Sequence, residues 1–197
     1  LQNQYVRLQN QLKKVSFFNK LIIFSIVVLF SILFYLSIPA LYDYERVQKQ
    51  LKLQLLNEFN LNFNVSNKIQ YKILPYPHFE IIDSVLYTDS KENQKLGDIK
   101  NLKIFISSLN LINQENIKLK NIKIVNSLFY LNQNSKKYLK DYFKKANFDK
   151  KIFIKKNKFF LKRKNEIISI FPIKNLILKY NKEKFENEII INGKAFN

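Results

Sequence analysis

The first pattern along the chain is a continuous apolar run at residues 21–38, LIIFSIVVLFSILFYLSI, which contains no charged residue. As an α-helix it would be about 27 Å long, close to the hydrocarbon thickness of a bilayer. A core helix of a soluble protein would have a polar face, and a cleaved signal peptide would have a shorter apolar region. The run therefore predicts an uncleaved transmembrane helix, with Leu21, Phe30 and Ile38 as membrane-anchor residues.

The charges on the two sides of this run predict its orientation. The tail of residues 1–20 contains four Lys or Arg and no acidic residue, whereas Asp43 and Glu45 precede Arg46, the first basic residue after the run. The positive-inside rule then places the basic tail in the cytoplasm and residues 39–197 on the other side of the membrane.

A helical period of apolar residues follows Pro39, which ends the run. Between residues 42 and 59 apolar side chains recur at steps of three and four, so the juxtamembrane segment 39–60 is expected to contain an amphipathic helix. Its stripe either forms the first face of a domain or lies on the membrane surface. The stripe consists of Tyr44, Val47, Leu51, Leu55 and Phe59.

After residue 60 the apolar period changes to two, which is typical of β-strands with one buried face. Pro75 and Pro77 cannot lie in the middle of a sheet and mark a corner. Only residues 135–147 return to a helical period, with Ser135 as the expected N-cap. The spacing favours an antiparallel meander, so residues 61–197 are expected to form one mainly β domain. The expected strands cover residues 61–65, 69–73, 79–87, 99–106, 117–130, 152–161, 167–180 and 189–196.

The composition excludes several classes of protein. Without Cys and with a single His the chain has no zinc finger, thiol redox site or disulfide framework, and two isolated Gly exclude a P-loop or dinucleotide fingerprint. The single histidine, His78, has no serine elbow nearby and is interpreted as a surface or corner residue. Glu80 and Asp83 lie on opposite faces of a predicted strand without a third ligand. We therefore expect a protein that is not an enzyme, with no cofactor and no metal site.

The net charge of +19 is a weak clue to a partner. Of the 34 basic residues 31 are Lys and three are Arg, and the abundance of Asn, Ile, Phe and Lys matches a bias toward A/T-rich codons. The densest segment, residues 136–164, combines thirteen Lys or Arg with two Asp and several Phe. It could be a solvated face, a contact with anionic lipid headgroups or a single-strand binding surface. Because residues 39–197 are expected on the far side of the membrane, the single-strand binding surface is disfavoured, and no nucleic acid is expected as a partner.

The ends of the chain predict a fragment of a longer protein. It begins at Leu1, contains no Met, and stops within the strand pattern of residues 188–197.

The order of these features resembles the N-terminal region of the AsmA family over about residues 15–132. The resemblance rests on the tail, anchor and amphipathic helix with Asp43-Tyr44, followed by a strand that enters the turn LPYPHF at residues 74–79. The strands IDSVL at residues 82–86 and NIKLKNIKI at residues 116–124 follow in the family's order.

This resemblance implies a bacterial inner-membrane protein, single-pass, that projects a curved β-sheet into the periplasm. The apolar groove of the sheet would bind and transfer phospholipid in support of outer-membrane biogenesis, with outer-membrane or periplasmic assembly proteins as further partners. An apolar sheet face must in any case close, pair or hold acyl chains, and a single bulge would reverse which residues face inward. The groove candidates are Ile81, Val85, Leu102, Ile104, Leu119, Ile122, Ile124 and Phe129.

Two other functions remain open from the sequence. The chain could be an anchored, non-catalytic scaffold whose sheet edge holds an assembly partner, or it could anchor an enzyme domain that lies beyond Asn197.

Overall fold

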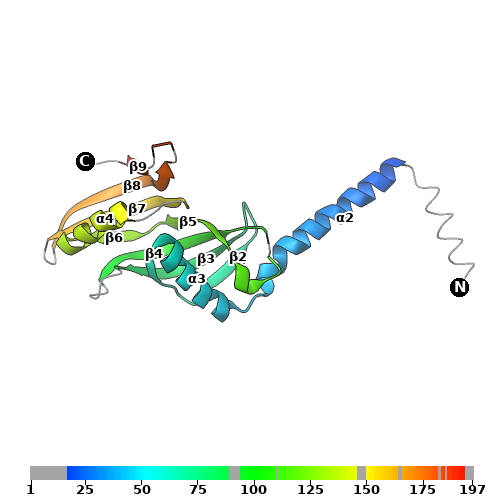
Figure 1. The fold of residues 1–197 in the computed structure, drawn as a ribbon, viewed down its shortest axis with the longest axis horizontal. Helices are drawn as coiled ribbons and strands as arrows, with labels where there is room; N and C mark the ends of the chain where they lie inside the picture. Colours follow the sequence, from blue (N-terminus) through cyan, green and yellow to red (C-terminus); the bar gives the residue numbers. More distant parts are fainter. Residues whose placement is uncertain are drawn as a thin grey trace, which may run out of the picture.

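The protein consists of a long apolar helix that projects from one end of a mainly β domain (Figure 1). The computed structural model describes residues 17–88, 94–109, 111–145, 150–163, 166–181, 183–184 and 186–193.

The apolar run forms helix α2 (Phe17–Ser37), which is followed by the 3₁₀ turn η1 (Ile38–Leu41). Together they are long and apolar enough to cross a membrane. The prediction that this run forms a helix is confirmed, and the predicted anchor residues Leu21 and Phe30 lie exposed within α2. Ile38 does not lie in the α-helix. It belongs to η1 and packs against the domain core, because Pro39 takes a first position of that turn and cannot donate a helical hydrogen bond.

Helix α3 (Tyr44–Phe59) packs into the domain core. Asp43 caps its first turn, since Asp43 Oδ1 accepts a hydrogen bond from the backbone N–H of Glu45 at 3.0 Å. Val47, Leu51 and Leu55 are fully buried. The amphipathic stripe therefore forms a face of the domain and does not lie on the membrane surface.

All nine described strands belong to one sheet. At one edge, β1 and β2 both pair with the same side of β3, and β3 pairs with β4. β5 and β6 then lie one after the other between β4 and β7. β8 follows β7, and β9 forms the other edge. The strands are β1 (Asn62–Asn64), β2 (Ile69–Lys72), β3 (His78–Tyr87), β4 (Lys95–Ile106), β5 (Leu119–Val125), β6 (Leu128–Leu131), β7 (Ile152–Arg163), β8 (Glu166–Asn181) and β9 (Glu186–Gly193).

The expected antiparallel meander is wrong at one step, because β5 and β6 both pair with β7 in parallel. Helix α4 (Gln133–Lys145) connects β6 to β7 and returns the chain along the sheet, as a parallel crossover requires. Asn132, rather than Ser135, precedes the helix as its cap. The Asn132 N–H donates to Ser135 Oγ at 2.7 Å, and the Ser135 N–H donates to Asn132 Oδ1 at 2.8 Å.

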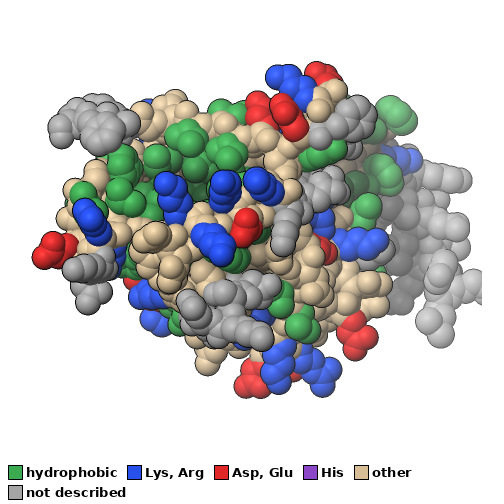
Figure 2. Space-filling view, turned by 60° about the vertical axis from the view of Figure 1, so that its left-hand side comes forward, with side chains coloured by type: hydrophobic (Ala, Val, Ile, Leu, Met, Phe, Trp, Pro, Cys, Tyr) green, Lys and Arg blue, Asp and Glu red, His purple; other side chains and the backbone are tan. Residues whose placement is uncertain are grey.

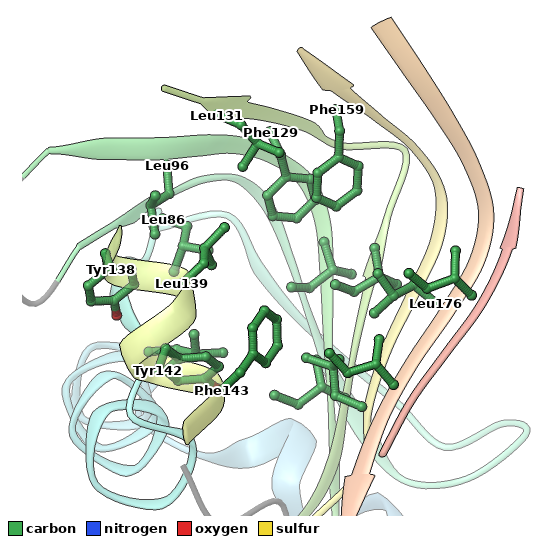
Figure 3. A pocket seen from close by; sticks show the side chains of 17 residues that line it. Leu86, Leu96, Phe129, Leu131, Tyr138, Leu139, Tyr142, Phe143, Phe159 and Leu176 are labelled. Atoms are coloured by element: carbon green, nitrogen blue, oxygen red, sulfur yellow. The ribbon is translucent and has the colours of Figure 1, made fainter. Parts of the chain in front are cut away.

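A line of irregular residues, here called the seam, crosses the sheet. Asp83 in β3, Asn126 between β5 and β6, and Lys156 in β7 have left-handed backbone conformations, with φ of 60°, 54° and 55°. Asp83 and Lys156 reverse the alternation of β3 and β7, and Asn126 separates β5 from β6. In β7, Ile154 faces the helices before the seam and Phe159 faces them after it. Such irregularities increase local bending, and the sheet curves around α4 (Figure 3).

Two buried polar side chains replace the hydrogen bonds that the seam interrupts. Asn157 Oδ1 accepts from the backbone N–H of Ser127 at 2.6 Å, and Ser127 Oγ accepts from the backbone N–H of Lys100 at 3.1 Å. Both side chains are buried, so the backbone donors that they satisfy would otherwise lack a partner away from water.

A buried carboxylate lies on the opposite face of the sheet, away from the helices. Glu80 alternates with the core residues Phe79 and Ile81, and its carboxylate forms ion pairs with Lys72 and Lys103. Burial by itself raises the pKa of Glu80, but hydrogen bonds and attraction from the two lysines together outweigh it, so the pKa is lowered from its ordinary value of 4.5.

We expect Glu80 to make the stability of the domain depend on acidic pH. A carboxyl with a lowered pKa in the folded state stabilises fully above its unfolded pKa, and the stabilisation is lost as the pH falls through the folded value. The free energy of unfolding of wild type and Glu80→Gln, measured by urea denaturation, should therefore differ most at neutral pH, and the difference should shrink as the pH falls below 4.5, through the lowered pKa of the folded state. Glu183→Gln, an exposed control, should show no such convergence.

Candidate functional site

An apolar cavity of about 260 Å³ lies between α4 and the sheet (Figure 3). No polar surface lines it. Strands β3 to β9 form one wall, with Leu86, Leu96 and Leu176 among their side chains, and α4 forms the other. The wall from α4 consists of Tyr138, Leu139, Tyr142 and Phe143.

A hydrogen bond joins α4 to α3 and fixes one side of the cavity. The buried Tyr142 hydroxyl donates to the backbone carbonyl of Phe59, the last residue of α3, at 2.7 Å. Burial, together with the neighbouring Tyr138, raises the pKa of Tyr142, so its hydroxyl stays neutral. Phe143 packs edge-on against Tyr142, with ring centroids 5.7 Å apart, and lines the cavity.

Aromatic stacking forms part of the sheet wall. Phe129 in β6 and Phe159 in β7 are direct neighbours in the parallel register, and their rings stack with centroids 4.6 Å apart at an angle of 12°. Gly97 of β4 is the partner of Phe129 on the other side. Since Gly97 has no side chain, the Phe129 ring can lie close to the backbone of β4.

The cavity opens toward the edge strand β9. Ile189 and Ile191 line it and are exposed, whereas Ile124 and Ile152 deeper in the sheet are buried. Figure 2 shows hydrophobic side chains that reach the surface beside a row of Lys or Arg side chains.

Two of the eight predicted groove residues, Ile124 and Phe129, line this cavity. Val85 instead lies on the opposite face beside Asp98 and Lys100, because the left-handed Asp83 reverses the alternation of β3. The other five belong to the closed core that α3 covers, and none of them lines the cavity: Ile81, Leu102, Ile104, Leu119 and Ile122.

Sequence reasoning missed the contribution of α4 to this site. The helical period at residues 135–147 was sufficient to predict the helix, but the strands that its stripe faces come from distant parts of the chain. In the basic segment, Phe143 and Phe159 face the cavity rather than solvent, which removes them from any base-stacking surface. Phe148 and Lys164 lie outside the described residues.

The single histidine lies at the corner where β3 begins, which agrees with one of its two interpretations, but it is buried, so its interpretation as a surface residue is wrong. Its Nδ1 lies 2.7 Å from the Tyr76 carbonyl, and its ring centroid lies 5.1 Å from that of Phe105. Burial lowers the pKa of His78 and favours the neutral ring. Within the described part of the chain, no group of three or more His, Cys, Asp or Glu is placed to hold a metal.

The cavity that α4 and strands β3 to β9 form together is therefore an apolar site. Comparison with known proteins adds no assignment, since neither a protein-family model nor a curated protein matches the chain.

Proposed function

We propose that this protein is a membrane-anchored lipid-binding protein that shelters phospholipid acyl chains in the cavity between α4 and the sheet. The observation that carries this proposal is a cavity of about 260 Å³ without polar surface, whose lining residues Ile189 and Ile191 are exposed on the edge strand β9. Purely apolar cavities of about 150 Å³ already take up small hydrocarbons and exclude water. A hydrocarbon chain is the ligand chemistry that such a lining favours.

The energetics favour a lipid acyl chain that can enter and leave the cavity a few methylenes at a time. Each methylene sheltered from water contributes about 0.8 kcal/mol, so a few methylenes are enough for measurable affinity. No polar surface faces the cavity to fix a headgroup, which would therefore remain outside, near the exposed Ile189 and Ile191. This arrangement suits binding and transfer and requires no catalytic step.

The resemblance to the AsmA family extends the proposal to location and partners. In that setting α2 would span the bacterial inner membrane, the tail would be cytoplasmic and the β domain periplasmic. Phospholipid would be the cargo and outer-membrane biogenesis the process served, with assembly proteins of the periplasm or outer membrane as partners.

Photocrosslinking in living cells would test the proposal. A photoreactive amino acid would replace Leu139 or Ile191, which line the cavity, and Lys137 or Ile190 as controls that do not line it. We expect lipid adducts at Leu139 and Ile191 only. Adducts to proteins alone, or lipid adducts of equal yield at all four positions, would instead favour the scaffold function.

A further inference from the structure

Three segments that are distant in the sequence lie at the end of the domain from which α2 departs (Figure 1), and each of them carries large apolar side chains that are exposed. They are η1, the β2–β3 turn at residues 73–77 and the start of the β4–β5 connection at residues 107–109 and 111–113, here called the apolar tips. Their most exposed side chains have between 71% and 85% of their surface accessible. These are Leu41, Leu74, Tyr76, Leu109 and Ile112.

Hydrogen bonds hold the apolar tips close to the end of α2. The Tyr71 hydroxyl, at the base of the β2–β3 turn, donates to the Leu36 carbonyl at 2.6 Å. The Leu111 N–H donates to the Tyr35 hydroxyl at 3.2 Å, and the Tyr42 hydroxyl donates to the Leu111 carbonyl. Both Tyr35 and Leu36 belong to the last turns of α2. The position of the tips relative to the helix end is therefore fixed by contacts and not by a flexible linker.

The apolar tips also differ from the rest of the surface in charge. The sequences IPALY at residues 38–42, ILPYP at residues 73–77 and SSLNLIN at residues 107–113 contain no charged residue, in a chain with 34 Lys or Arg. In other turns that the structure describes, the exposed residues include Asn67, Lys68, Glu183 and Lys184. Exposed Leu and Ile without neighbouring charges are costly in water, whereas Tyr is favoured at the membrane–water interface.

We propose that the apolar tips enter the headgroup region of the bilayer on the side where α2 ends, so that the domain docks on the membrane surface. The proposal rests on α2 spanning the membrane, as in the proposed function, but it does not require that the cavity binds lipid. The bilayer is the occupant that the structure favours, because hydrogen bonds hold the tips beside the end of the one described helix that is long and apolar enough to cross it. Interfacial apolar segments of this kind reach about 5–10 Å into the boundary between headgroups and acyl chains.

The lack of Trp in the chain makes the test direct, since each introduced Trp is the only one. The full chain would be reconstituted in phosphatidylcholine vesicles that contain lipids brominated either near the headgroup or deep in the acyl chain. Tyr76→Trp and Leu109→Trp report on the tips, and Ile26→Trp reports on the middle of α2. Ile168→Trp is the matched control, because Ile168 is 58% exposed but lies at the opposite end of the sheet.

We expect Trp at positions 76 and 109 to lose fluorescence with the shallow bromines and far less with the deep ones, and Trp at position 168 to be quenched by neither. Quenching of Ile26→Trp by deep bromines without quenching at positions 76 and 109 would overturn the docking while leaving the anchor in place. Absence of quenching at position 26 would overturn the anchor and the docking together. Lipid uptake by the cavity is measured separately by the crosslinking experiment.

Discussion

Replacing Ile189 by glutamate is expected to reduce the amount of phospholipid bound to the protein by roughly tenfold or more. Ile189 lines the mouth of the cavity, and a carboxylate there cannot be desolvated without a large cost. A lipid chain would have to withdraw from the charged rim. Withdrawal of only two methylenes costs about 1.6 kcal/mol, which corresponds to about a fifteenfold loss of affinity.

The neighbouring residue provides a matched control for this substitution. Ile189 and Ile190 are 42% and 41% exposed, lie in the same edge strand, and differ in the face of the sheet to which they belong. Ile190→Glu therefore carries the same change in charge, volume and strand propensity, but it should leave lipid binding unchanged. The measurement is the molar ratio of phospholipid to protein after purification in a mild detergent, from organic extraction and mass spectrometry. Equal losses in both variants would show that charge on β9, rather than the cavity, controls the bound lipid.

Local pattern was sufficient to predict most elements of this fold. The stripe from Val47 to Phe59 predicts α3 because a helix that packs on a core needs one apolar face, and the same alternation that predicts β4 and β5 recurs in the structure as buried and half-buried positions. These signals are properties of a segment and its two faces. They do not depend on which other segment covers the buried face.

The errors arose where a distant contact or a single backbone conformation decides the outcome. The position of Val85 follows from the left-handed Asp83, and the exchange of faces in β7 follows from Lys156. Asp and Asn adopt this conformation more readily than other residues, so Asp83 and Asn126 carried a readable signal, whereas Lys156 did not. The parallel pairing of β7 depends on α4 crossing the sheet. Its length and period predict the helix but not the direction in which it returns the chain.

The candidate site illustrates the same limit. The alternating and helical patterns included residues of both walls of the cavity. The groove residues predicted from the resemblance, however, lie mostly in strands that α3 covers. Ile104 and Ile122 are as apolar as Ile124 and Ile152, and only the placement of α3 and α4 decides which of them is sealed in the core and which borders a cavity. The docking surface was hidden for another reason, because its three segments are adjacent only after folding.

Replacing Gly97 by alanine is expected to destabilise the domain by about 1–3 kcal/mol, the usual cost of overpacking a core. The backbone of Gly97 is not left-handed, so backbone conformation does not explain why this position is a glycine. The explanation is that a larger side chain would lack space. An added Cβ would lie 2.6 Å from the Leu128 carbonyl oxygen and 3.1 Å from the Phe129 ring. The carbonyl belongs to the backbone of β6, which is held between β4 and β7 and cannot move without disturbing both pairings.

The other glycine of the chain serves as the control, since Gly193 lies exposed at the end of the edge strand β9. A Cβ there would lie 3.0 Å from the Pro172 carbonyl oxygen, a contact that the end of an edge strand can relieve by a small shift. In thermal unfolding of the full chain in detergent, Gly97→Ala should lower Tm by about 2–4 °C for each kcal/mol lost, and Gly193→Ala should lower it much less. Because the displaced Phe129 ring would move toward the cavity, Gly97→Ala should also reduce bound lipid at temperatures where the domain remains folded. An unchanged Tm for Gly97→Ala would mean that β4 and β6 are not as closely packed as the Phe129–Phe159 wall of the cavity requires.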